Sequence, residues 1–157
     1  MDTAALIDQY AAGPQLLREA VAGMTTEQLA ARPVTGKWTT LEVVCHLADF
    51  EPIYLDRMKR VIAEDEPTMF GGDPDVFARR LAYDRREIQE ELDLISACRT
   101  QMARLLRTLS PADFQRKGIH NEAGPLTLLE LLRRVTEHLP HHVQFIREKR
   151  QALGRPA

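Results

Sequence analysis

Hydrophobic residues recur three or four positions apart through most of this chain, which is the spacing that lets an α-helix bury one face. The clearest stripe consists of Ile88, Leu92, Ile95, Met102 and Leu105. No segment alternates apolar and polar residues as a half-buried strand does. The pattern therefore predicts a protein built from helices, without a β-sheet.

Start signals divide this pattern into separate helices. Three capping boxes open helices, at Thr25-x-x-Gln28, Thr39-x-x-Glu42 and Thr127-x-x-Glu130. With Asp73-Pro74 as a further start signal, the helices are expected over roughly 2–21, 25–32, 39–65, 74–108 and 127–152, with breaks near Pro14 and Tyr83. Four of them are long and amphipathic. We therefore expect one all-α domain over 1–157, an antiparallel four-helix bundle with short additional helices in the connections.

The composition indicates which class of protein this is, but it says less about the function. Hydrophobic residues make up 44% of the chain, charged residues 28%, and the net charge is −2. These values are typical of a globular domain, and the scattered basic residues argue against binding to nucleic acid or to an anionic membrane. No apolar run is long enough to cross a bilayer and no signal peptide is recognisable, so we expect a cytoplasmic protein. Cys45 and Cys98 form no CxxC pair and are expected to be buried thiols.

The strongest indication of chemistry is a set of three histidines on predicted apolar stripes. His138 and His142 are four residues apart, so they are neighbours on one face of the last helix. His46 lies on the line of Val43 and Phe50 in an earlier helix and also points inward. A single histidine on an apolar face is more often a hydrogen-bonded core residue. Three together match the number of protein ligands in a catalytic zinc-type site, with one position left for water or substrate.

Pro140 lies between two of these histidines and leaves two outcomes open. Proline removes a helical hydrogen bond and crowds the preceding turn, so it either bends the helix or breaks it. A bend keeps His138 and His142 on one face, whereas a break makes the ligand set uncertain. The hydrophobic spacing continues past Pro140, which favours a bend.

Other polar residues near these segments have simpler interpretations. Asp49 follows His46 by about one helical turn and could orient an imidazole or act as a base, but a solvated aspartate is the simpler interpretation. Trp38 is expected to anchor the core at a helix start and, beside the site, to form a pocket wall. Glu91 is expected on a solvated face, and His120 in an exposed polar loop.

Three segments together resemble the DinB/YfiT-like metalloenzyme family. They are Gly36-Lys37-Trp38 with the helix through His46 to Glu51, Gly124-Pro125-Leu126-Thr127-Leu128, and Glu137-His138-Leu139-Pro140-His141-His142-Val143-Gln144. The resemblance covers nearly the whole chain and implies a four-helix bundle, often dimeric, that binds a divalent metal. It assigns His46, His138 and His142 as ligands, in agreement with the helical spacing. It implies zinc or nickel first, and three imidazoles also suit iron or manganese.

What the resemblance implies about activity is broader than a single reaction. Characterised relatives transfer low-molecular-weight thiols or isomerise substrates with a thiol, so we expect a small-molecule substrate and either thiol transfer or metal-assisted hydrolysis. A metal held by three neutral imidazoles acidifies a bound water or thiol, which serves both reactions. The alternatives are a non-catalytic protein whose metal has a structural or regulatory role, and a stress-related interaction protein that acts through its surface without a metal. The family name implies no DNA binding, and a homodimer is expected from the resemblance alone.

Overall fold

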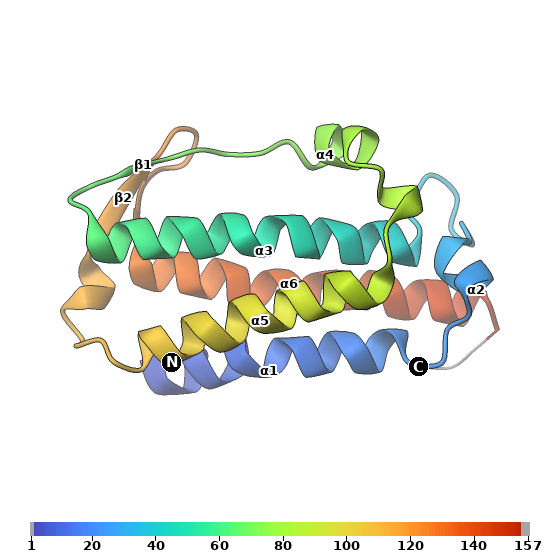
Figure 1. Ribbon diagram of the computed structural model, residues 1–157, viewed down its shortest axis with the longest axis horizontal. Coiled ribbons are helices and arrows are strands. Elements are labelled where there is room, and N and C mark those ends of the chain that lie inside the picture. The colour runs from blue at the N-terminus through green and yellow to red at the C-terminus, as the bar shows by residue number, and fades with distance from the viewer. Residues whose placement is uncertain (1, 155–157) are drawn as a thin grey trace.

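The computed structural model describes residues 2–154, and within them it shows a helical bundle (Figure 1). Its long helices are α1 (Thr3–Val21), α3 (Thr40–Ala63), α5 (Ile88–Leu106) and α6 (Leu128–Ala152). Shorter helical elements in the connections are α2 (Thr26–Ala30), α4 (Pro74–Arg80) and the 3-10 turns η1 (Tyr83–Arg85) and η2 (Asp113–Gln115). The expected four-helix bundle with short helices in its connections is confirmed.

The long helices do not alternate in direction along the chain, which corrects the expectation that the bundle is simply antiparallel. Helices α3 and α5 run one way, and α1 and α6 run the other way (Figure 1). Residues 64–87, which we call the strap, make this possible because they return the chain along the outside of α3 to the start of α5. Helix α3 packs against both α5 and α6. The strap therefore covers the outer side of α3, while α6 is its antiparallel neighbour in the bundle.

Three short strands at one end of the bundle correct the expectation of a chain without a sheet. Strand β1 (Thr68–Met69) pairs in parallel with β2 (Lys117–His120), which pairs antiparallel with β3 (Gly124–Thr127). The strands are only two to four residues long, too short for a recognisable alternation. At Gly118 a Cβ would lie 2.9 Å from the Pro67 carbonyl oxygen, so the strand needs glycine there.

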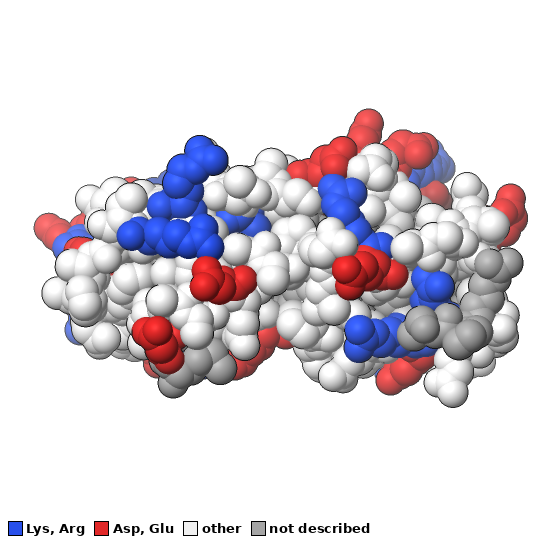
Figure 2. Space-filling view, turned by 90° about the horizontal axis from the view of Figure 1, so that it is seen from below, with Lys and Arg blue, Asp and Glu red and all other residues white. Residues whose placement is uncertain are grey.

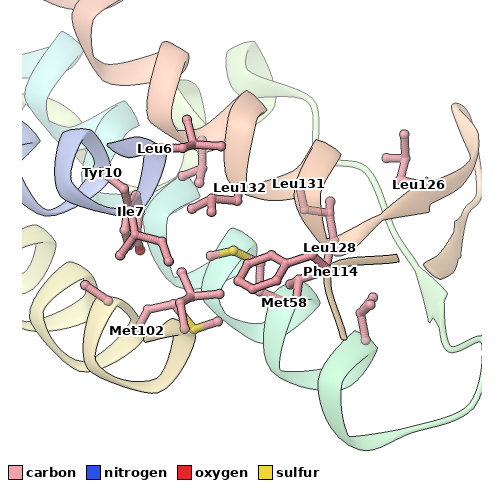
Figure 3. Packing of buried hydrophobic residues seen from close by; sticks show 14 of the residues in the cluster. Leu6, Ile7, Tyr10, Met58, Met102, Phe114, Leu126, Leu128, Leu131 and Leu132 are labelled. Atoms are coloured by element: carbon pink, nitrogen blue, oxygen red, sulfur yellow. The ribbon is translucent and has the colours of Figure 1, made fainter. Parts of the chain in front are cut away.

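Two hydrophobic clusters fill the bundle, one towards each end. The first joins all four long helices to the hairpin, and Figure 3 shows Phe114 in its middle, beside Met58 and Leu128, with Leu126 at its edge. The second includes Leu47 and lies in the half of α3 that also carries His46. Cys45 and Cys98 are buried and form no disulfide, as expected.

A buried ion pair lies where the two clusters meet. Arg99 of α5 and Glu51 of α3 are 2.9 Å apart with side chains only 1% exposed, and the Tyr10 hydroxyl donates to Glu51 at 3.0 Å. Arg99 also donates to the Tyr10 carbonyl at 3.1 Å, and Pro14 leaves this carbonyl available because proline has no N–H. Gly13 leaves room for the guanidinium, since a Cβ there would lie 2.2 Å from Arg99 Nη1. The interruption expected near Pro14 is therefore a polar contact within a continuous helix.

The surface has no continuous area of one charge on the face shown in Figure 2, where acidic and basic side chains are interspersed. This view is from the side of α1 and α5 in Figure 1. It agrees with the scattered basic residues of the sequence. Among the described residues, no helix is both long enough and apolar enough to cross a membrane.

Candidate metal centre

Three histidines from two helices come together in one place. His46 lies in the second turn of α3, whose start is set by the capping box at Thr39, and it is only 5% exposed. His138 and His142 are half-buried and one turn apart on α6. Helix α6 continues through Pro140 without a break, so the interpretation that the two rings stay on one face is confirmed.

The spacing of the nitrogen atoms is suited to a metal ion. Nε2 of His46 lies 3.0 Å from Nε2 of His138, and one ligand nitrogen from each of the three rings lies within 4.8 Å of the others. Two imidazole nitrogens on one tetrahedral zinc ion, each bonded at about 2.0–2.1 Å, are about 3.4 Å apart. Small rotations of the rings would bring all three nitrogens to that spacing. His46, His138 and His142 therefore fit a divalent metal.

The pKa values of the three imidazoles are lowered, so each ring keeps an unprotonated nitrogen that can bind a metal. Burial lowers the pKa of His46 to about 4 and that of His138 and His142 to about 3, and for the latter two the neighbouring imidazoles lower it further. The rings are therefore neutral near pH 7. Nδ1 of His46 and Nδ1 of His142 are buried without a hydrogen-bond partner among the described residues. Nε2 of His46 is the nitrogen that faces His138, so a metal bound there leaves Nδ1 of His46 unpaired, and these orphaned atoms do not separate a ligand from a core histidine.

The lowered pKa values predict a pH-dependent stability of the metal-free protein. Each histidine takes up a proton near pH 6.5 in the unfolded chain but only near pH 3–4 in the folded protein. The unfolded state therefore binds more protons in this window, and the free energy of unfolding falls as the pH falls below about 6.5. We expect a loss of about 1 kcal/mol per histidine between pH 7.0 and 5.5. Urea unfolding with a chelator present measures it, and a pH-independent midpoint would contradict it.

Aromatic rings surround the three histidines. The Trp38 ring lies 5.2 Å from the His46 ring, and Phe50 lies 4.7 Å from it, measured between centroids. Phe77 of α4 packs on Phe50 at 5.3 Å, so the strap closes this wall from outside. Trp38 is thus both a half-buried anchor at the start of α3 and a wall of the site. An apolar wall excludes water and strengthens the interaction of any charge with the imidazoles.

Asp49 belongs to a separate ion-pair group beside the site. Its Oδ1 accepts a hydrogen bond from Arg86 at 2.8 Å, and Arg86 also pairs with Glu91. Burial raises the pKa of the neighbouring Tyr83 hydroxyl, and the negative charge of Asp49 raises it further. No hydrogen bond joins Asp49 to a histidine in the described part of the chain. Glu91 is only 5% exposed, which corrects its expected place on a solvated face, because the strap brings Arg86 against it.

The other two histidines lie outside this group. His141 is exposed on α6, as expected of a residue flanking the buried stripe. His120 is buried, 8% exposed, and its Nδ1 accepts hydrogen bonds from the backbone N–H groups of Glu122 and Ala123, both at 3.2 Å. The expectation that it lies in an exposed loop is wrong, because the polar segment folds into the β2–β3 hairpin.

A cavity of about 450 Å³ opens beside His142. It lies between α6 and the connection from α2 to α3, at the end of the bundle opposite the strands (Figure 1). Its lining residues are Val34, Gly36, Lys37, Trp38, Val43, His142, Phe145, Glu148 and Lys149. This volume is in the range of small-molecule sites. Sequence reasoning missed Lys149, whose position seven residues after His142 places it close to the same face of α6.

The fold and the clustered histidines define a class of protein: a four-helix bundle with a candidate three-histidine metal centre in its core. The chain belongs to the DinB superfamily, whose sequence model matches residues 9–146. This confirms the resemblance noted in the sequence.

Individual relatives agree with this assignment. A protein of Geobacillus thermodenitrificans named "Putative metal-dependent hydrolase" is 34% identical, over 90% of this chain and 80% of its own length. A relative from Oceanobacillus iheyensis with the same description is 32% identical, over 85% of this chain and 77% of its own length. The structure of YfiT from Bacillus subtilis, described as a probable metal-dependent hydrolase with an unusual four-helix bundle topology, has a TM-score of 0.90. It is 28% identical in sequence, and the match covers 96% of this chain and 87% of YfiT.

Proposed function

We propose that this protein is a metal-dependent hydrolase of a small molecule, with a divalent metal held by His46, His138 and His142. The observation that carries the proposal is the convergence of three neutral imidazoles from α3 and α6 beside a cavity. The names of the relatives support the same class of reaction. Zinc and nickel are the first candidates for the metal because imidazole ligands suit both.

In such a site, different residues of the chain would have different roles. A divalent metal with three neutral ligands supplies a Lewis acid and lowers the pKa of a water molecule to about 7. The three histidines bring no negative charge, so they leave the charge of the metal undiminished. Trp38 and Phe50 keep bulk water away from the imidazoles. The cavity beside His142, the one histidine of the three among its described lining residues, would hold the substrate.

Metal analysis and hydrolysis assays on one protein sample test this proposal. Protein purified without a histidine tag is expected to contain about one divalent metal per chain. It is expected to hydrolyse simple aryl esters, to lose this activity on chelation and to regain it with zinc or nickel. Absence of metal, even after incubation with both ions, would contradict the proposal.

The test must also distinguish thiol transfer from hydrolysis at the same site. A parallel assay contains a low-molecular-weight thiol and an electrophilic aryl halide, and it measures loss of free thiol. Metal-dependent thiol consumption without ester hydrolysis would replace hydrolysis by group transfer as the function of the same site. Stoichiometric metal with neither activity on any probe would favour a binding or regulatory role and contradict the hydrolase proposal.

A further inference from the structure

The cavity beside His142 is lined by a buried lysine that forms no ion pair with any carboxylate in the described part of the chain. Lys149 of α6 is only 3% exposed, and it is the one buried lysine among the described residues. Its Nζ donates to the Phe145 carbonyl at 3.3 Å and lies 5.9 Å from the centre of the Phe145 ring. Among the described residues, no carboxylate oxygen comes within 4.0 Å of it to form an ion pair. A buried ammonium group with one hydrogen bond is costly, since it can donate three.

Around this ammonium group the positive charges exceed the negative charges by one, so the cavity can accept one negative charge. Lys37 and Lys149 both line the cavity, whereas Glu148 is the only carboxylate that lines it among residues 2–154. Glu42, which also influences Lys149, is already bonded to Arg32 at 2.6 Å. Burial is the main cause that lowers the pKa of Lys149, and Lys37 lowers it further. The lining of the cavity therefore carries one net positive charge when both lysines are protonated.

The rest of the lining is apolar and leads to the candidate metal centre. Val34, Trp38, Val43 and Phe145 form walls between the lysines and His142. Residues 142 and 149 are seven positions apart on one helix, about 10 Å along its axis, and the Lys149 side chain reaches back to the Phe145 carbonyl, which brings its Nζ nearer to His142. A molecule that spans this cavity has a charged group at one end, an apolar middle and its other end at His142.

From this arrangement we propose that the cavity binds a small monocarboxylate with an apolar body, whose carboxylate is held by Lys149 and Lys37. As an assignment of substrate class, this inference rests on the proposed function. The bond to be hydrolysed then lies at the His142 end of the cavity. A dianion such as a phosphate monoester fits less well because Glu148 repels the second charge and no arginine is among the described residues that line the cavity.

Trp38 provides a direct measure of binding, because it is the only tryptophan of the chain and lines the cavity. We expect 3-phenylpropanoate to change its fluorescence with saturation, and the uncharged 3-phenylpropanamide to bind at least about tenfold more weakly. 2-Phenylethylphosphonate is expected to bind more weakly than the carboxylate. Equal binding of acid and amide, or tighter binding of the phosphonate, would overturn the proposal. These comparisons use the unaltered protein, so they do not depend on the folding of any variant.

Two variants then locate the charge. Lys149→Met is expected to raise the Kd of 3-phenylpropanoate at least about tenfold and to leave that of the amide unchanged. Lys117→Met is the matched control, because Lys117 lies on β2 and pairs with Glu66 at 3.2 Å. An equal effect of both variants, or no effect of Lys149→Met, would overturn the assignment to Lys149. Metal analysis of the same samples separates the two proposals: carboxylate binding by a protein that takes up neither zinc nor nickel contradicts the hydrolase, whereas metal uptake without carboxylate binding contradicts this inference.

Discussion

His142→Ala is expected to bind zinc or nickel at least about a hundredfold more weakly than the unaltered protein, since one of three ligands is lost. The three imidazoles provide nitrogen atoms within 4.8 Å of one another, so no single ring can be removed without opening the site. Alanine is compatible with the middle of α6, and the apo fold is expected to survive. Competition with a chromophoric chelator measures the affinity, and elemental analysis of the purified variant measures retention.

The neighbouring residue offers a matched control for this variant. His141→Ala removes an exposed imidazole from the same helix, and it is expected to leave metal affinity unchanged. Thermal unfolding gives a second readout, because a ligand that binds only the folded state raises Tm. Zinc is expected to raise the Tm of the unaltered protein and of His141→Ala, but not that of His142→Ala. Equal metal loss in both variants would show that the site is not the buried set of three.

The clustering of the three histidines was predictable because helical periodicity alone decides which face a residue occupies. His46 shares a stripe with Val43 and Phe50, and His138 shares one with His142, so each pointed inward before any packing was known. The capping boxes set the starts of α3 and α6 within a residue or two. What remained open, whether Pro140 breaks α6, depended on tertiary packing.

The groups that the sequence did not reveal are held by contacts between distant segments. Arg86 meets Asp49 across 37 positions of the chain, and no local pattern indicates that contact. The strap brings them together, and its path follows from the parallel arrangement of α3 and α5, which amphipathic spacing does not specify. Lys149 was missed for a different reason: a lysine near the end of a helix is usually solvated, whereas here the α2–α3 connection covers it.

The cytoplasmic location, the homodimer, the absence of nucleic-acid binding and the use of a low-molecular-weight thiol all remain predictions. The assignment of His46, His138 and His142 as ligands remains a proposal until metal is measured. Asp49 is a weaker candidate for catalysis than before, because Arg86 engages its carboxylate at 2.8 Å.

Arg99→Met is expected to lower the free energy of unfolding by about 3–5 kcal/mol. Arg99 is fully buried and pairs with Glu51 at 2.9 Å, so its removal leaves a buried carboxylate without a cation. Burial already raises the pKa of Glu51, and Arg99 opposes that rise. The variant is therefore expected to bind a proton at Glu51 more readily, so that its deficit shrinks as the pH falls towards the ordinary range of glutamate. Urea unfolding of the metal-free protein across pH measures both effects.

Two further variants separate the buried charge from the loss of packing. In Arg99→Met/Glu51→Leu both charges are gone, and stability is expected to recover most of the loss, because replacing a whole buried ion pair by apolar groups is often nearly neutral. Arg18→Met breaks an exposed pair with Asp93, 2.6 Å apart, and is expected to cost less than about 1 kcal/mol. A double variant as unstable as Arg99→Met would mean that Arg99 acts mainly by filling space beside Gly13. Recovery of stability in the double variant would mean that Gly13 and Pro14 of α1 serve mainly to accommodate the buried charge of Arg99.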